Sequence, residues 1–283
     1  MSARTDIASE SAFLSGAASL SGVKKQQERC ESALLDITRI EILSDDAAEK
    51  VGKPKGRYLT LRSLDGGFDS EPGCLNERAR LLAREIRALL PDDLGAGVLF
   101  AGLGNRLITP DCIGPLAADR ILATRHIESR ALERLGELAR VSVISPGVTA
   151  QTGLESAEVI SLISGRIRPS AVIVCDAFAC AELDNLAVTV QLSDTGISPG
   201  SGVNNSRAEI SQRTLGLPCI AVGIPTVADI AAVTDDPAVP KGMIMTPGRI
   251  DTVVSRGAAL IALSVNLALH RSLTVDEINS LVG

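Results

Sequence analysis

The chain has 283 residues, of which 45% are hydrophobic, and its 34 acidic and 28 basic side chains give a net charge of -6. This acidic balance argues against a nucleic-acid-binding surface, which carries clustered Lys and Arg, and one Tyr and four Phe are too few for a base-stacking platform. Two His and no Trp nearly exclude catalysis that needs several histidines. We therefore expect a soluble globular protein that does not bind nucleic acid directly.

The N-terminal part of the chain divides into a polar segment and the first periodic elements. Residues 1 to about 30 are rich in Ser, Ala and charge without periodicity, which predicts a mobile or loosely packed segment ahead of a single α/β domain over 31–283. Alternation over 57–62 predicts a strand. Apolar residues at helical spacing predict a helix over 76–90, with Asn76 as its N-cap.

From residue 97 onward, short apolar runs alternate with amphipathic stretches. This pattern indicates parallel strands that are buried on both faces. We therefore expect a doubly wound α/β fold with a mostly parallel sheet and helices on both faces. The predicted strands are 97–101, 141–145, 171–175, 188–192 and 219–223, and the predicted helices are about 115–139, 154–166, 250–270 and 274–282.

The cysteines and the chain start bear on cofactors and compartment. The six cysteines form no CxxC pair and no Cys/His cluster, which disfavours a zinc site and thioredoxin-like chemistry. Residues 1–20 lack the apolar stretch of a signal peptide, and the sequence has no run of 18 consecutive apolar residues. We expect no metal, no cofactor, no membrane association and a reducing cytoplasm.

Three loops follow predicted strands, and in an open parallel sheet ligands and catalytic groups collect at that carboxyl edge. The loop 102–115 contains Asp111. Asp176 comes directly after the apolar run 171–175. The third loop, 191–202, is polar and rich in Gly, and it is long enough to line a cleft.

Nucleotide binding is a weak alternative for these loops. Leu107 stands where a dinucleotide fingerprint needs Gly or Ala, and no GxxxxGK[ST] motif follows any strand. Positive φ angles in tight turns would equally account for the glycines 102, 104, 196, 200 and 202.

Histidine and cysteine nucleophiles are also disfavoured. His126 lies among apolar residues of a predicted helix and His270 ends another, so packing or capping explains both. Cys112 and Cys175 each adjoin an Asp, but buried Cys is common in cores and no basic partner is evident in the sequence.

Asp111 and Asp176 remain as a candidate pair at neighbouring strand ends. Two carboxyl groups a few ångströms apart cannot both ionise, so one keeps a proton while the other can activate water. Such a pair could cleave an amide without metal, histidine or thiol. Helix caps and Asx turns are the structural alternative, and spacing alone favours that alternative.

At these residues the chain resembles the germination proteases of spore-forming bacteria, an unusual family of aspartic-type endopeptidases. The resemblance runs in family order through nearly the whole chain. It is carried by RTDIA (4–8), GRYLTL (56–61), GLGN (102–105), TPDCIGP (109–115), TGLES (152–156), VCDA (174–177), QLSDTGISPGSGV (191–203), GIPTV (223–227) and NLALH (266–270).

This resemblance implies a function and an assembly. The two essential aspartates of the family fall on Asp111 and Asp176. The family resembles the hydrogenase-maturation endopeptidases in fold, its members form homotetramers, and its substrates are the small acid-soluble spore proteins that coat DNA. The implied location is the cytoplasm of the forespore and the spore core.

The N-terminus resembles the sequence that the family cleaves, Thr-Glu-(Phe or Ile)-Ala-Ser-Glu, because residues 5–10 read Thr-Asp-Ile-Ala-Ser-Glu. Family members are made as inactive precursors that remove their own N-terminal segment. The resemblance therefore implies self-cleavage between Asp6 and Ile7. The alternative is a disordered tail with an inherited or accidental match.

Supporting residues and departures complete the expectation. Asn105 and the backbone amides of 196–202, with Gly196, Gly200 and Gly202, are candidates for supporting hydrogen bonds, and Asp194 is a further candidate carboxylate. Arg106 and Leu107 replace the Trp-Asn usual in the family, and the region 236–243 is contracted. A hydrogenase-maturation-type endopeptidase and a non-catalytic protein that binds spore proteins remain alternatives.

Overall fold

The computed structural model describes residues 5–11, 20–68, 74–128, 134, 136–200, 207–230 and 243–282. Within these ranges the strands are β1 (Val23–Cys30), β2 (Leu35–Ile42), β3 (Gly56–Ser63), β4 (Val98–Gly102), β5 (Val141–Ile144), β6 (Ala171–Cys180), β7 (Thr189–Ser193), β8 (Cys219–Asp229) and β9 (Ile244–Met245). The α-helices are α2 (Asp45–Val51), α3 (Leu75–Leu89), α4 (Ile113–Ala118), α6 (Thr149–Thr152), α7 (Ser156–Ile167), α8 (Gln212–Leu215), α9 (Ile250–Leu269) and α10 (Val275–Val282). Short 3₁₀ turns are η1 (Ala8–Glu10), η3 (Thr109–Asp111) and η4 (Leu183–Asn185).

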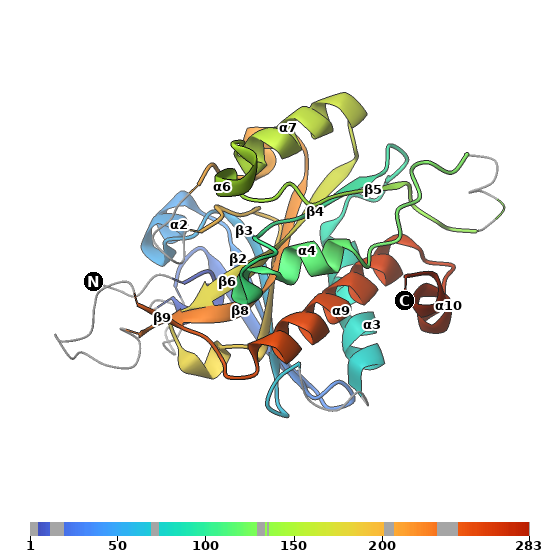
Figure 1. The fold of residues 1–283 in the computed structure, drawn as a ribbon. Helices are drawn as coiled ribbons and strands as arrows, with labels where there is room; N and C mark the ends of the chain where they lie inside the picture. Colours follow the sequence, from blue (N-terminus) through green and yellow to red (C-terminus); the bar gives the residue numbers. More distant parts are fainter. Residues whose placement is uncertain are drawn as a thin grey trace.

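The described strands form one mixed sheet in the order β1-β2-β3-β7-β8-β6-β4-β5, with β9 paired to β8 (Figure 1). The strands β5, β4, β6 and β8 run parallel to one another. All other pairings are antiparallel, including β8 with β7, β7 with β3, and the β1–β2–β3 meander. The α/β class is confirmed, but the prediction of a mostly parallel sheet is wrong.

Two local features explain this mixed sheet. β1 is exposed along nearly its whole length, so its sequence lacks the apolar alternation by which a strand is recognised, and it escapes prediction. β2 is also missing from the predicted elements, although its apolar residues are buried. The connection 181–188 between β6 and β7 is too short for a parallel crossover, which needs a dozen or more residues. The chain therefore returns antiparallel, and β7 joins β3.

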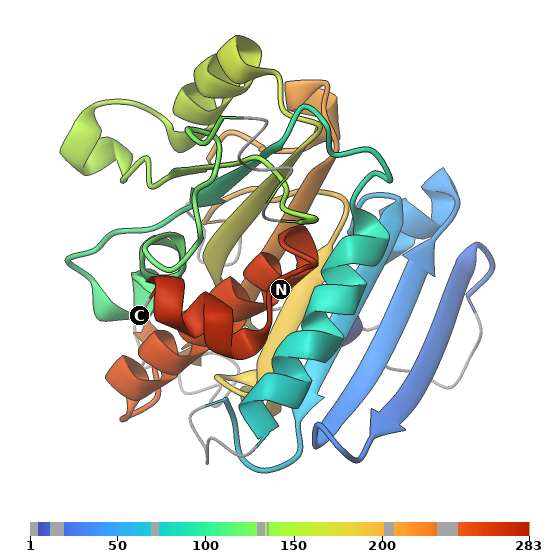
Figure 2. The same cartoon turned by 90° about the vertical axis from the view of Figure 1, so that its right-hand side faces the viewer.

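Helices cover both faces of the sheet, as expected (Figures 1 and 2). Along β4, Val98 and Phe100 point into the larger core beneath α3, α4 and α9, whereas Leu99 and Ala101 point into a second core with α7. All four side chains are fully buried or nearly so. This burial on both faces accounts for the continuous apolar run in the sequence.

The long helices largely match their predictions. α3, α7, α9 and α10 correspond to the predicted helices, and Thr274 and Glu277 form the capping box that opens α10. α9 is long and apolar enough to cross a membrane by length and composition alone, but 72% of that stretch is buried inside the protein as a core helix. Asn76 is not the N-cap of α3, because the helix begins one residue earlier, after Cys74.

The helix predicted over 115–139 is confirmed for 115–118 and is wrong over 119–128. α4 ends at Ala118, and the chain continues in turns. Asn266 of α9 explains this break: its side chain accepts a hydrogen bond from the Leu122 amide at 2.9 Å and donates to the Arg120 carbonyl at 2.8 Å. Residues 129–133 and 135 lie outside the described part.

The N-terminal segment is not loosely packed where the structure describes it. Ile7 and Ala8 are fully buried. β1 pairs with β2 from Val23 to Cys30, so the expected boundary near residue 30 falls inside a hairpin of the sheet. The division into a removable segment and a peptidase domain stays a prediction.

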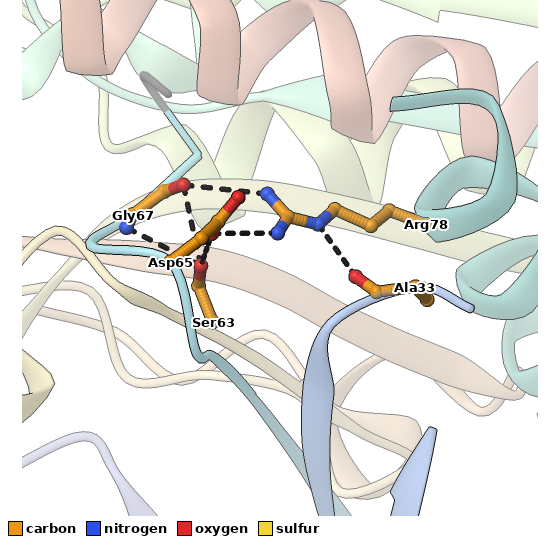
Figure 3. Close-up of polar contacts among 5 residues, drawn as sticks. All are labelled: Ala33, Ser63, Asp65, Gly67 and Arg78. Carbon is orange, nitrogen blue, oxygen red and sulfur yellow. Dashed lines mark hydrogen bonds and ion pairs between the residues drawn. The ribbon is translucent and has the colours of Figure 1, made fainter. Parts of the chain in front are cut away.

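A buried arginine fixes α3 against the ends of β2 and β3 (Figure 3). Arg78 is 4% exposed and lies over the ring of Phe68. Its guanidinium donates to the carbonyls of Ala33 at 2.9 Å and Gly67 at 3.3 Å, and to the carboxylate of Asp65 at 2.7 Å. These bonds compensate the cost of burying the charge, and they attach α3 to the side of the sheet formed by β1, β2 and β3.

α4 packs directly against backbone at the carboxyl end of β4 and beside β6. A Cβ atom at Gly114 would lie 2.2 Å from the carbonyl oxygen of Leu103 and 2.4 Å from that of Cys175. Only glycine fits between two carbonyls at this distance. This contact presses the start of α4, and with it Asp111, against β6.

We predict that Gly114→Ala lowers the free energy of unfolding by about 1–3 kcal/mol, because backbone must move to admit the methyl group. Gly165→Ala is the matched control. A Cβ at Gly165 in α7 meets no atom within 4 Å, so helix propensity should stabilise that variant by about 0.5–1 kcal/mol. Urea unfolding of both variants measures the difference, and equal effects would contradict the close contact.

Candidate active site

Asp176 lies in β6, Asp111 lies in the loop that follows the neighbouring parallel strand β4, and both line one cavity of about 290 Å³. β4 and β6 pair in register up to Gly102 and Cys175, and the Leu103 amide continues this ladder by donating to the Cys175 carbonyl at 2.8 Å. Asp111 ends η3, at the close of the loop that follows β4. Asp176 lies inside β6, not after it, because the strand continues to Cys180.

The loop 103–111 folds back so that its own backbone holds the Asp111 carboxylate. The amide of Asn105 donates to Asp111 Oδ2 at 2.8 Å. The intervening Gly104 has a φ of +121°, and a Cβ there would lie 1.9 Å from the Asp111 carbonyl oxygen. Glycine at 104 is therefore a condition for the position of Asp111.

Asp176 is the more deeply buried member of the pair, with 6% of its surface exposed. The Ala177 amide donates to its Oδ1 at 2.9 Å. Burial raises the pKa of Asp176 well above its usual range, and the negative charge of Asp111 raises it further. Asp176 is thus the carboxyl group that favours the protonated form.

Asp111 has a different electrostatic environment. Burial raises its pKa, but the Asn105 amide and the positive charge of Arg207 act in the opposite direction. Each carboxyl group accepts a hydrogen bond from a backbone amide and lies near the charge of Arg207, so the two differ in degree: Asp176 is the more deeply buried, and the charge of Asp111 raises its pKa further.

Arg207 lines the same cavity and is a site residue that the sequence interpretation missed. Its positive charge lowers the pKa of both aspartates. The backbone amide of Arg207 donates to the Pro199 carbonyl at 3.0 Å, which holds it beside the Gly-rich loop. Arg207 is the first basic residue after that loop in the sequence, a signal that could have suggested it.

The predicted supporting residues divide between the cavity and its surroundings. Gly200 lines the cavity, and Gly196 lines an adjacent one, whereas Gly202 lies outside the described residues. The side-chain oxygen of Asn105 accepts from the Leu107 amide, so its backbone, not its side chain, faces Asp111. Asp194 is bound elsewhere.

The Asp194 carboxylate pairs with Arg57 at the junction of β3 and β7. It accepts from the Arg57 amide and from Arg57 Nε, both at 2.7 Å. The structure thus gives Asp194 a role in joining two strands, and it does not bring this carboxylate to the cavity of Asp111 and Asp176.

The predicted processing site lies beside the aspartate pair. Asp6 lines their cavity, its amide donates to the Ala179 carbonyl, and the Ala179 amide donates back to Asp6 Oδ2, both at 2.9 Å. Ile7 is fully buried against Phe178, Cys180 and Ala228. The bond between Asp6 and Ile7 is therefore anchored on both sides, on the stretch of β6 that follows Asp176.

The thiols and histidines are placed as structural groups. Burial raises the pKa of the Cys112 and Cys175 thiols, which keeps both protonated and poorly nucleophilic. His270 is buried after α9, with Nε2 3.2 Å from the Leu122 carbonyl, and burial lowers its pKa. His126 is exposed in a turn and not in the predicted helix. Among the described residues, no three His, Cys, Asp or Glu side chains are grouped so that they could hold a metal ion.

Two carboxyl groups with raised pKa values, in one cavity beside a bound stretch of the chain, are the arrangement expected of an aspartic-type peptidase. Comparison with known proteins gives the family: the model of the germination proteases matches residues 5–240. The chain belongs to the germination protease family of aspartic-type endopeptidases.

Two relatives in this family align with nearly the whole chain, and a third aligns with about three quarters of it. The germination protease of Caldanaerobacter subterraneus subsp. tengcongensis is 35% identical over 99% of this chain and 98% of its own. That of Clostridium tetani is 32% identical over 99% of both, and that of Bacillus cytotoxicus is 40% identical over 74% of this chain and 58% of its own. Among solved structures, a NiFe-hydrogenase maturation protease from Thermococcus kodakarensis aligns with 64% of this chain and 98% of its own, at 15% identity and a TM-score of 0.37.

We predict that Asp176→Asn stabilises the protein at neutral pH. When folding raises the pKa of a carboxyl group above its unfolded value of 3.8, the protein loses stability as the pH rises from 3.8 toward the folded pKa. Asn keeps the acceptor for the Ala177 amide but has no proton to lose. The melting temperature of the variant should exceed that of the parent by a margin that grows from about pH 4 to about pH 7, by roughly 2–4 °C for each kcal/mol. A constant margin would contradict the raised pKa.

Proposed function

We propose that Asp111 and Asp176 are the catalytic pair of this endopeptidase, and that it initiates the degradation of small acid-soluble spore proteins during germination. The observation that carries the proposal is the pair itself: two carboxyl groups with unlike environments line the cavity that Asp6 also lines. The substrate class comes from the family resemblance and from the substrate-like sequence of residues 5–10.

The unlike environments suggest the role of each aspartate. Asp111, whose charge is stabilised by the Asn105 amide and by Arg207, takes a proton from water as the water oxygen bonds to the scissile carbonyl carbon. Asp176, desolvated and protonated, gives its proton to the carbonyl oxygen. The tetrahedral intermediate then returns that proton to Asp176 and breaks the C–N bond, and Asp111 passes its proton to the leaving amine.

The same chemistry accounts for removal of the N-terminal segment. Asp6 and Ile7 lie on β6 beside Asp176, and the charge of Asp6 is one of the causes that raise the pKa of Asp176. We infer that the chain is made as a precursor and cleaves itself between Asp6 and Ile7. Cleavage removes Asp6 from the cavity and leaves room for a substrate.

The remaining features follow from the family resemblance. The substrates are DNA-coating proteins of the spore, so the enzyme acts in the cytoplasm of the forespore and in the spore core without itself binding DNA. We propose a homotetramer as the assembled form. No step of the mechanism calls on a metal or an organic cofactor.

Substitution of either aspartate tests the catalytic pair. We predict that Asp111→Asn and Asp176→Asn each lower kcat/KM on a peptide containing Thr-Glu-Ile-Ala-Ser-Glu by at least about 10³-fold, because each removes one half of the proton transfer. Asp92→Asn, an exposed carboxylate in the α3–β4 connection, is the control and should keep full activity. A fully active Asp176→Asn variant would refute the assignment.

Two further outcomes of this assay separate the alternatives. Loss of cleavage after addition of a metal chelator would favour a hydrogenase-maturation-type mechanism. Tight binding of the peptide without any cut would favour a protein that only binds spore proteins.

Intact mass tests self-cleavage. We predict that the chain, incubated at mildly acidic pH, loses Met1 to Asp6 and begins at Ile7, whereas Asp176→Asn retains the full mass, because the same pair must cut the Asp6–Ile7 bond. Asp92→Asn should be processed like the parent. An active preparation that retains Met1 to Asp6 would contradict the proposed processing.

A further inference from the structure

The segment from Thr5 to Ser11 is bound by contacts that depend on its side chains. Beyond Asp6 and the buried Ile7, the Ala8 amide donates to Gln191 Oε1 at 3.2 Å. Ala8 is fully buried in a cluster with Ile40 and Tyr58, where a larger side chain has no room. A peptide that binds in the same way therefore needs a small residue at the position of Ala8, two positions after that of Asp6.

Glu10 has the most specific contacts in this segment. Its carboxylate accepts three hydrogen bonds from the stretch after β6: from the Ala181 amide at 2.7 Å, from the Glu182 amide at 3.1 Å and from Asn185 Nδ2 at 2.7 Å. We call these three donors the carboxylate cradle. Removing the carboxylate would leave the donor of a buried side chain without its partner, which costs free energy.

Asn185 is built into the fold in a single orientation. It is 7% exposed, and its backbone amide donates to the Glu182 carbonyl at 3.0 Å. Thr189, fully buried in β7, donates from its hydroxyl to Asn185 Oδ1 at 3.3 Å. The Thr189 contact occupies the side-chain oxygen, so the NH₂ group of Asn185 faces Glu10.

The cradle binds a carboxylate although other acidic side chains lie close to it. Glu182 and Asp184 lie close by, and burial together with the charge of Glu10 raises the pKa of Glu182. Two cations lie nearby. Lys53 Nζ donates to the Thr5 carbonyl at 2.8 Å, and its charge faces Asp6 and Glu10; Arg62 pairs with Asp184 at 3.8 Å, and its charge lowers the pKa of Glu182. A carboxylate is thus held among acidic neighbours by three directed N–H donors, which indicates recognition and not general attraction.

We infer that the carboxylate cradle is a substrate subsite. In a substrate, the acidic side chain that it binds stands where Glu10 stands in this chain, four positions after the residue that corresponds to Asp6. Asn185 is the residue that selects this acidic side chain. This inference rests on the proposed function. Residues 5–11 occupy the subsite in the intact chain. After cleavage between Asp6 and Ile7, the new end must leave the cradle before a substrate glutamate enters it, so the segment and the substrate compete for the same donors.

Peptide cleavage by the self-processed protein tests the subsite. Two peptides are compared, one containing Thr-Glu-Ile-Ala-Ser-Glu and one with Ala in place of the final Glu. We expect the parent to prefer the Glu peptide by about 10- to 100-fold in kcat/KM, the value of one or two charged hydrogen bonds. Asn185→Ala should reduce this preference about tenfold, whereas Asn76→Ala, exposed in the first turn of α3, should retain it.

Asn185→Asp guards against a folding defect. Asp keeps the acceptor for Thr189 but places a negative charge against the substrate glutamate, so this variant should prefer the Ala peptide over the Glu peptide. A preference for Glu that is the same in the parent, Asn185→Ala and Asn185→Asp would overturn the inference.

Hydrogen exchange in the full chain tests the cradle without any cleavage. The amides of Ala181 and Glu182 are protected by Glu10, so Asn185→Ala should speed their exchange about tenfold and Asn76→Ala should leave it unchanged. Faster exchange in a chain that cuts neither peptide would keep the cradle and reject the proposed function. Unchanged exchange in Asn185→Ala would reject the cradle, whatever the peptide assay gives.

Discussion

The structure of the site depends on the burial of one carboxyl group, that of Asp176, beside a second one. A charge at this position has little solvent and a like charge opposite, so burial and the charge of Asp111 raise the pKa of Asp176 well above its usual range. Three neighbouring contacts place the second carboxyl group: Gly114 lets α4 pack against β6, Gly104 lets the loop after β4 fold back, and the Asn105 amide donates to the Asp111 carboxyl group.

β6 is long enough to carry Asp176 and also to bind the N-terminal segment. In an open parallel sheet the ligand site lies beyond the strand ends, but β6 and β8 run past that edge as a pair, to Cys180 and Asp229. The extension presents Ala179 to the backbone of Asp6 and buries Ile7 against Phe178 and Cys180. Asp6 and Ile7 are therefore held on the same strand that carries Asp176, and their position relative to the carboxyl pair is set by strand geometry.

The sequence predicts the aspartate pair because the physics of strand ends is local. Asp111 and Asp176 each follow an apolar run, and runs buried on both faces are recognisable in one dimension. The error over Asp176 is instructive: the residues 176–180 continue the strand, but a charged residue in the run looks like its end. Long-range partners are beyond such an argument, which is why Arg207 is missed and Asp194, committed to Arg57, is overvalued.

The fold shows the same limit. The parallel half follows from its apolar runs, whereas β1 is invisible because most of its side chains are exposed, and α4 ends early because Asn266, far along the chain, binds the backbone at 120–122. The N-terminal segment is the strongest case. Its composition is that of a tail, and it is ordered by pockets and donors from distant parts of the chain, among them Ile40, Tyr58, Ala228 and several residues of 178–191.

The chemistry of that ordering bears on how an acidic protein can accept an acidic peptide. With a net charge of -6, and with Glu182 and Asp184 close to the cradle, the chain gains little from general electrostatic attraction. The cradle supplies two backbone amides and the fixed NH₂ group of Asn185, which bind a carboxylate by geometry and without a paired cation. Lys53 adds one charge nearby, bonded to the Thr5 carbonyl. Directed neutral donors recognise the position of an acidic residue along the peptide, whereas a basic patch would recognise only its charge. An enzyme that must select one bond in its substrates needs recognition of position.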